Sequence, residues 1–410
     1  MLMLNQLSTG VKQYLVVTGN YWAFTLTDGA LRMLVVLYFH QLGYAPLQIA
    51  LLFLFYEFFG VVTNLVGGWL GARLGLNRTM NIGLALQIVA LVMLLVPAEW
   101  LTVAWMMVAQ AFSGIAKDLN KMSAKSAIKT LVPADAQGRL YHWVALLTGS
   151  KNALKGFGFF LGALLLTWLG FAGAVLVMAI MLTLVWIASL FLLKQELGRM
   201  KNKPKFTDVF SKSRAINVLS LARFFLFAAR DVWFVVALPV YLSQTLGWDF
   251  WQIGGFMASW IVAYGVVQAL APRITGKADG RVPGRNATAS WGLALAITPL
   301  LILLGFYLQW QPDTLIITGL LLFGLLFAVN SSVHSFLIVS HARSDGVSLD
   351  VGFYYMANAM GRLIGTLLSG YVFQVWGLTA CLWISALFIL LAALIALAMP
   401  KPEITNTTSQ

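Results

Sequence analysis

Charged residues are scarce in this sequence, and their scarcity excludes a water-soluble protein. Only 10% of the residues are Asp, Glu, Lys or Arg, whereas soluble domains carry about 25%. Hydrophobic residues make up 60% of the chain, and apolar runs long enough to cross a bilayer as helices recur along its whole length. Continuous runs rather than alternation argue against a β-barrel. We therefore predict an all-α membrane protein.

Cysteine is almost absent as well. Cys381 is the single cysteine, which excludes an internal disulfide and a cysteine-rich metal site. The histidines are scattered without metal-ligand spacing, at His40, His142, His334 and His341. The sequence has neither a phosphate-binding P-loop nor a Gly-x-Ser-x-Gly nucleophile motif, so a nucleotide-driven pump is excluded. We expect no enzyme activity, no cofactor and no metal.

Hydropathy predicts twelve transmembrane helices. They lie at about 14–39, 47–70, 79–97, 101–123, 141–168, 172–193, 215–243, 251–271, 289–309, 314–338, 350–375 and 378–399. Of the 27 Lys and Arg residues, 19 lie in the termini and in the loops on the same side, and the opposite loops hold none. The positive-inside rule therefore predicts that both termini are cytoplasmic. The net charge of +13 reports topology and does not indicate nucleic-acid binding.

The two halves of the sequence are similar to each other. LGYAPLQIA at 42–50 matches LGWDFWQIG at 246–254, and NALKGFG at 152–158 matches NAMGRLIG at 358–365 with one insertion. The offset is about half of the chain, which predicts two pseudo-symmetric six-helix halves. The predicted division is an N-terminal half at 1–193, a basic cytoplasmic linker at 194–214, a C-terminal half at 215–400 and a tail at 401–410. This plan resembles the major facilitator transporters.

A glycine-rich segment after the second helix strengthens this resemblance. GGWLGARLGLNR at 67–78 is similar to the Gly-x-Leu-Ala-Asp-Arg-x-Gly motif of major facilitators, which implies a cytoplasmic gate. The gate candidates are Gly68, Arg73, Gly75 and Arg78. Ala72 stands where the motif has its acidic residue, and a degenerate second copy with Asp279 lies at 276–281. The two arginines also fit a simpler role as topology anchors.

Twelve charged residues fall inside the predicted helices, where each costs on the order of 3 kcal/mol at the bilayer centre. The cations are Arg32, Lys117, Lys121, Lys151, Lys155, Arg223, Arg230 and Arg362, and the acids are Asp28, Glu57, Asp118 and Asp231. The third, sixth, ninth and twelfth helices, which face lipid in major facilitators, hold no charge. The excess of cations indicates an anionic substrate, whose oxygens can bind them.

Depth along the helices selects the substrate site, because transporters bind substrate near the membrane midplane. The predicted substrate-binding residues are Arg32, Lys151, Lys155, Arg230 and Arg362, with Lys117 at the inner mouth. The candidates for ion pairing or proton coupling are Asp28, Glu57, Asp118, Asp231 and His334. Some of these residues can instead be purely structural ion-pair partners.

Local spacing gives further expectations about these charges. Asp28 and Arg32 are four residues apart on one helix and are expected to pair. Arg230 and Asp231 are adjacent and are expected to find partners elsewhere. The lysines at the end of the fourth helix, Lys125 and Lys129, are interpreted as topology anchors.

Longer segments resemble one branch of the major facilitators, the ArsJ family of organoarsenical effluxers. They are GNYWAFTLTDGALRMLVVLYFHQLGY at 19–44, FFGVVTNLVGGWLGARLGLNRTMNIG at 58–83, SGIAKDLNKMSAKSAIK at 113–129, GSKNALKGFGFFLG at 149–162 and residues 210–242. The resemblance implies export of 1-arseno-3-phosphoglycerate across the bacterial inner membrane, and hence arsenate resistance. It also implies a functional link to glyceraldehyde-3-phosphate dehydrogenase, which makes this compound when arsenate replaces phosphate. We expect a monomer embedded in membrane lipids.

Other functions are open at this level. A transporter of another organic anion, such as a sugar phosphate or a carboxylate, shares every feature except the ArsJ resemblance. A multidrug effluxer of cationic drugs is disfavoured by the positive excess. A membrane enzyme acting on a phosphorylated lipid would need a nucleophile or metal site, and the sequence shows none. The sequence does not distinguish proton antiport from passive exit.

Overall fold

The computed structural model describes residues 9–44, 52–133, 136–193, 197–275 and 282–400. Part of the first repeat segment (45–50), the second gate-like copy (276–281) and the tail (401–410) lie outside these residues. The division of the chain at 194–214 also stays a prediction.

The described chain is helical. The first half contains α2 (Thr9–Gln41), α4 (Leu54–Leu74), α5 (Leu76–Met93), η1 (Ala98–Trp100), α6 (Val103–Leu131) and α7 (Gln137–Leu192). A short helix, η2 (Phe206–Val209), precedes the second half. That half contains α8 (Arg214–Phe234), α9 (Ala237–Gln244), α10 (Phe250–Ile274), α11 (Arg285–Tyr307), α12 (Pro312–His341) and α13 (Val347–Leu397).

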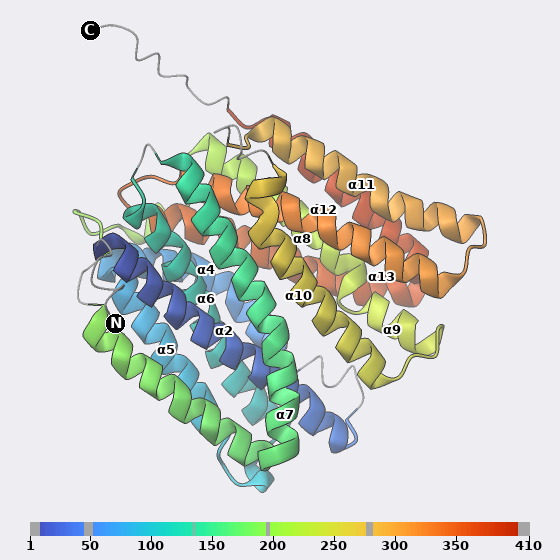
Figure 1. Ribbon diagram of the computed structural model, residues 1–410, viewed down its shortest axis with the longest axis horizontal. Coiled ribbons are helices and arrows are strands. Elements are labelled where there is room, and N and C mark those ends of the chain that lie inside the picture. Colours follow the sequence, from blue (N-terminus) through green and yellow to red (C-terminus); the bar gives the residue numbers. More distant parts are fainter. Residues whose placement is uncertain (1–8, 45–51, 134–135, 194–196, 276–281, 401–410) are drawn as a thin grey trace, which may run out of the picture.

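Two of these helices each supply two membrane-crossing arms. Gly170 in α7 and Gly377 in α13 have φ angles of 67° and 75°, a backbone conformation that glycine tolerates best. The chain turns back within α7 (Figure 1). The two turns divide α7 and α13 where the sequence predicts separate helices, and their positions are equivalent in the two halves.

Eight segments of the described chain meet the length and hydropathy expected of a membrane span, one of them α8 together with α9 (Arg214–Gln244). Helices α4 and α6, which carry interior charges, are not among them. The predicted seventh span is divided into α8 and α9. Pro239 explains the break, because its ring would clash with the carbonyl of Val235, four residues earlier.

Glycines at equivalent repeat positions set the packing inside each half. A Cβ atom on Gly158 would lie 2.7 Å from the carbonyl oxygen of Leu26, and one on Gly365 would lie 2.7 Å from that of Ala228. Neither position accommodates a side chain without moving backbone. The first arm of α7 therefore lies close against α2, and the first arm of α13 lies equally close against α8.

The helices without charge lie at the outside of the bundle. The second arm of α7 and α11 run along opposite edges of the molecule (Figure 1). Large apolar side chains on these outer helices are exposed, among them Val92, Leu184, Leu304 and Trp383. Exposed apolar surface of this extent suits contact with lipid, as expected for these four segments of the sequence.

The two ends of the described chain lie on the same side of the bundle. Tyr14, near the start of α2, and Met399, after α13, belong to one buried apolar cluster. We call this side the terminal side and the opposite one the far side. That the terminal side faces the cytoplasm stays a prediction from the charge distribution.

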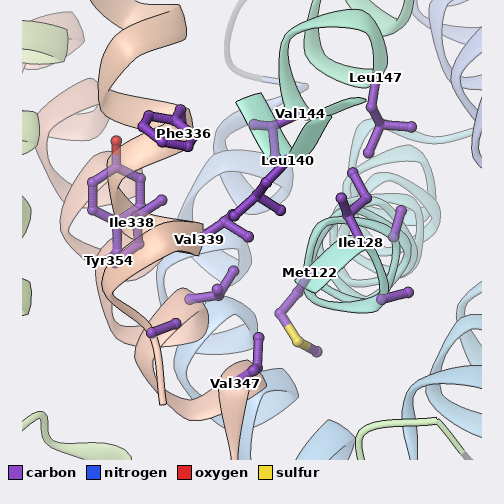
Figure 2. Close-up of a cluster of buried hydrophobic side chains, with 14 of the residues drawn as sticks. Met122, Ile128, Leu140, Val144, Leu147, Phe336, Ile338, Val339, Val347 and Tyr354 are labelled. Atoms are coloured by element: carbon purple, nitrogen blue, oxygen red, sulfur yellow. The ribbon is translucent and has the colours of Figure 1, made fainter. Parts of the chain in front are cut away.

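The same apolar cluster closes the terminal side between the halves. Leu140 and Val144 of α7 face Phe336 and Val339 of α12 (Figure 2). Helix α12 packs here against α6 and α7, and α13 packs against α4 and α6, whereas α2 and α8 are not among the closely packed pairs of the described chain. The halves are therefore joined firmly on the terminal side.

Candidate functional site

A chain of ion pairs crosses the interior from one half to the other. Glu57 of α4 binds Arg32 of α2 at 3.2 Å and Arg362 of α13 at 2.8 Å. Arg362 also contacts Asp231 of α8 at 3.3 Å, and Asp231 binds Arg230 at 2.5 Å. Arg362 is fifteen residues from either end of its arm of α13. These charges therefore link the two halves at about mid-depth.

One pairing expected from sequence spacing is wrong, and the expectation that Arg230 and Asp231 find partners elsewhere holds only in part, because Asp231 also binds Arg362. Asp28 does not bind Arg32 but accepts a hydrogen bond of 2.7 Å from the hydroxyl of Tyr56. Arg32 turns to Glu57 and lies 4.6 Å from the ring centre of Tyr56. Asp231 pairs with the adjacent Arg230 because the long arginine side chain bends back to it. Partners on neighbouring helices outweigh the weak preference for four-residue spacing.

The acid of α6 holds two lysines. Asp118 binds Lys121 at 2.5 Å and lies 3.7 Å from Lys117. Lys117 also lies 3.9 Å from the ring centre of Tyr56, which brings it close to the ion-pair chain. Lys121 therefore points into the bundle instead of extending to the headgroups.

Lys125 is not a topology anchor. The α6 helix continues to Leu131, beyond the predicted end of its span, so Lys125 lies inside the bundle with 4% of its surface exposed. Its ammonium group donates to the hydroxyl of Tyr355 at 2.6 Å and to that of Thr148 at 2.9 Å. Lys129 donates to the carbonyl of Ser340 at 2.7 Å. Both lysines therefore bind the second half on the terminal side.

Four interior cations have no carboxylate partner among the described residues. Lys151 donates to the side-chain carbonyl of Asn152 at 3.2 Å. Arg223 donates to Asn358 at 2.9 Å and to the hydroxyl of Ser331 at 3.0 Å. The others are Lys125, described above, and Lys155, which forms neither an ion pair nor a hydrogen bond within the described chain. Counting Lys125, nine interior cations of the described chain face the acids Asp28, Glu57, Asp118 and Asp231; the buried Asp350 is bound by Arg343.

The repeat relates Lys155 to Arg362. Lys155 stands three residues before the packing glycine Gly158, and Arg362 stands three residues before its equivalent, Gly365. The two cations therefore occupy matching places on matching helices. They differ in surroundings, because Arg362 has two carboxylate partners and Lys155 has none in the described part of the chain.

Uncharged polar groups also connect the halves, although their residue types alone did not mark them as site residues. The side chain of Asn152 donates to that of Gln268 in α10. Gln268 in turn donates to the hydroxyls of Tyr264 at 2.9 Å and Ser331 at 3.2 Å. Asn152 and Asn358 head the two copies of the repeat, so the repeat itself was the signal for them. His334 is 1% exposed within this polar part of α12.

The gate candidates lie on the terminal side, at the end of α4. The hydroxyl of Ser348, at the start of α13, donates to the carbonyl of Gly68 at 2.8 Å. Arg73 lies over the ring of Trp69, 4.9 Å from its centre. Gly75, with a φ of 95°, forms the turn between α4 and α5, and Arg78 follows on α5. The segment therefore contacts the second half through backbone groups.

Ala72 stands at the acidic position of the gate motif and contributes its backbone instead of a charge. Its carbonyl accepts a hydrogen bond of 2.9 Å from the N–H of Met200. Across the gate, Arg343 binds Asp350 through its guanidinium, at 3.1 and 3.2 Å. The acid on this face is therefore supplied by α13 rather than by α4.

Comparison with known proteins identifies the family. Residues 17–345 match the family model described as Major Facilitator Superfamily. The chain belongs to the Major Facilitator Superfamily. No curated protein matches its sequence.

Solved structures of transporters share the fold of this major facilitator. The human organic anion transporter MFSD10 (TETRAN) has a TM-score of 0.75 at 17% identity, over 95% of this chain and 100% of that one. The E. coli fucose:proton symporter FucP has a TM-score of 0.72 at 14% identity, over 96% of this chain and 100% of that one. A bacterial homologue of the iron transporter ferroportin in an outward-facing state scores 0.70 at 15% identity, over 95% of this chain and 99% of that one. These structures show the shared fold, and membership of the superfamily makes the chain a membrane transporter and not an enzyme.

Proposed function

We propose that this transporter exports 1-arseno-3-phosphoglycerate, a small organic anion with two separated oxyanions, from the cytoplasm by alternating access. The observation that carries the proposal is the presence of mid-depth cations without carboxylate partners in the described chain, Lys155 above all. An isolated ammonium group in the bundle interior is costly. A phosphate or arsenate group would bind it through short, charge-assisted hydrogen bonds.

The arrangement of cations suits two oxyanions better than one. Lys151 and Lys155 belong to the first half, and Arg230 and Arg362 belong to the second. One group can bind the phosphate end of the substrate and the other the arsenate end, with the hydroxyl between them. A substrate that is bound by both halves at once favours the conformation that is closed on both sides. From this conformation either side can open and release the substrate.

The outward direction follows from energetics and from the charge distribution. We assign the terminal side to the cytoplasm and the protein, as a monomer, to the bacterial inner membrane. With the cytoplasm negative by about 100 mV, moving three negative charges out releases about 7 kcal/mol. Passive exit is then sufficient, and proton antiport is an additional possibility. Glyceraldehyde-3-phosphate dehydrogenase would supply the substrate, and the result would be arsenate resistance.

The alternative is a transporter for another organic anion, such as a sugar phosphate or a carboxylate. The same unpaired cations support it. The human neighbour named as an organic anion transporter shares only the fold at 17% identity. The ArsJ-like segments favour the organoarsenical.

Transport into inside-out vesicles tests the proposal. Arsenic uptake is measured with arsenate alone and with arsenate, glyceraldehyde-3-phosphate, its dehydrogenase and NAD together. We expect uptake only from the complete mixture, and we expect Lys155→Met to abolish it. Lys212→Met is the matched control, because it removes an exposed lysine of the segment before α8. Equal uptake with and without the dehydrogenase, or no uptake at all, would refute the organoarsenical as substrate.

A further inference from the structure

We infer that Glu57 is an internal competitor of the substrate for Arg32 and Arg362. The inference rests on the proposed function and deepens it, because it divides the substrate site into two parts with different behaviour. One part is the lysine pair Lys151 and Lys155, which has no carboxylate partner in the described chain. The other is the arginine pair, which a carboxylate of the protein already binds.

The contacts and exposure of Glu57 allow an anion to replace it at the two arginines. A single oxygen of Glu57, Oε1, accepts from Arg32 at 3.2 Å and from Arg362 at 2.8 Å. The Glu57 side chain is 22% exposed, whereas those of Asp231 and Asp118 are 0% and 1% exposed. Of these three acids, only Glu57 has surface that is accessible to water. Glu57 is therefore the carboxylate that an incoming anion can displace.

Contacts other than those with Glu57 also hold the two arginines. Arg362 contacts Asp231 at 3.3 Å. Arg32 lies 4.8 Å from the ring centre of Phe53 and 4.6 Å from that of Tyr56. These aromatic faces attract the guanidinium independently of Glu57. The arginines thus form a site that is positioned in advance for a planar or tetrahedral oxyanion.

A phosphate or arsenate group is the stronger ligand for this pair. It carries up to two charges and three free oxygens, so it can bind each guanidinium by two parallel hydrogen bonds. Glu57 offers one oxygen to both arginines. The substrate therefore displaces Glu57 from the arginines when the lysines hold its other end. When that end is free, Glu57 binds the arginines instead.

Competition also explains how a tightly bound polyanion can leave. As the substrate departs, Glu57 forms ion pairs again with Arg32 in its own half and with Arg362 in the other half. The returning carrier then crosses the membrane with its arginines paired, which avoids the cost of unpaired interior charge. Removing the Glu57 carboxylate should strengthen binding and slow turnover.

A neutral, isosteric substitution separates this role from a general field effect. Glu57→Gln removes one negative charge and leaves the two arginines only a neutral, weaker acceptor in its place. Asp28→Asn removes one negative charge from the same region, but Asp28 binds the Tyr56 hydroxyl and no arginine. Any gain in anion affinity that comes only from the loss of a nearby negative charge should appear in both variants.

The test is calorimetric titration of the purified protein with 3-phosphoglycerate, which has two anionic ends, and with inorganic phosphate, which has one. For Glu57→Gln we expect binding of 3-phosphoglycerate to tighten about tenfold, as for one added charge-assisted bond. Inorganic phosphate should gain less, since it can stay at the lysines. Transport of 3-phosphoglycerate into liposomes should become several-fold slower than wild type.

The outcomes distinguish the inference from the function on which it rests. If the wild type binds 3-phosphoglycerate and Glu57→Gln binds it no more tightly than Asp28→Asn does, competition by Glu57 is refuted and the anion site stands. If the wild type binds neither ligand at millimolar concentration, the anion-transport proposal fails together with the inference. Should Glu57→Gln not fold, Glu57→Asp, which is one methylene shorter, is expected to give a smaller gain in the same direction.

Discussion

The hydrogen bond between Lys125 and Tyr355 should hold the terminal side closed. It joins α6 of the first half to α13 of the second at 2.6 Å. Tyr355→Phe removes the hydroxyl and keeps the ring, which lies 4.9 Å from the ammonium nitrogen. Bonds to charged groups contribute about 1.5–3 kcal/mol in proteins, and membrane interiors give at most about 1.7. A loss of about 1.4 kcal/mol would raise the open population about tenfold.

Cysteine labelling measures that population. Cys381 is buried and is the only native cysteine, so Cys381→Ser provides a clean background. Val347→Cys then places a thiol in the closed apolar cluster of Figure 2, where Val347 is 1% exposed. When opening is fast, the rate of maleimide labelling follows the open fraction. We expect Tyr355→Phe to accelerate labelling about tenfold.

The neighbouring tyrosine provides the control. Tyr354 is equally buried, but its hydroxyl has no hydrogen-bond partner in the described chain. Tyr354→Phe should therefore leave the labelling rate unchanged. Equal rates in Tyr355→Phe and wild type, or equal acceleration by both substitutions, would refute the view that this hydrogen bond keeps the terminal side closed.

Three further predictions follow from packing and pairing. Lys155→Met should weaken calorimetric binding of 3-phosphoglycerate at least about tenfold without lowering the melting temperature, because Lys155 forms no ion pair or hydrogen bond in the described chain; a lower melting temperature would indicate a structural role. Gly352→Val should speed labelling on the terminal side, since a Cβ there would lie 2.6 Å from the carbonyl oxygen of Asn64; an unchanged rate would contradict this. Asp231→Ala should destabilise the protein by about 3–5 kcal/mol, because it removes a buried acid that binds both Arg230 and Arg362; thermal unfolding in detergent measures this, and an unchanged melting temperature would count against it.

Much of the fold was predictable because lipid permits few backbone arrangements. Every backbone polar group in a membrane must be satisfied within a helix or a closed barrel, so long apolar runs translate directly into helices. The turns at Gly170 and Gly377 lie between runs that hydropathy already separates. The break before α9 was missed, although Pro239 was visible in the sequence.

The sequence predicted which charged residues lie in the interior, but it did not predict which of them bind each other. An interior cation can be recognised from its place in an apolar run, as with Arg32 and Arg362. Its partner cannot, because Glu57 is 25 residues from the first and 305 from the second. Lys125 was misplaced for a related reason, since hydropathy reports where a helix leaves apolar sequence and not where the bundle ends.

The sequence by itself determined that this protein is a helical membrane transporter with a repeated half and an excess of interior positive charge. These properties depend on composition and on order along the chain. Only the tertiary structure decided that Glu57 binds two arginines while Lys155 has no acid partner in the described chain. Such pairing depends on which helices lie side by side, and that is decided by the packing of the whole bundle.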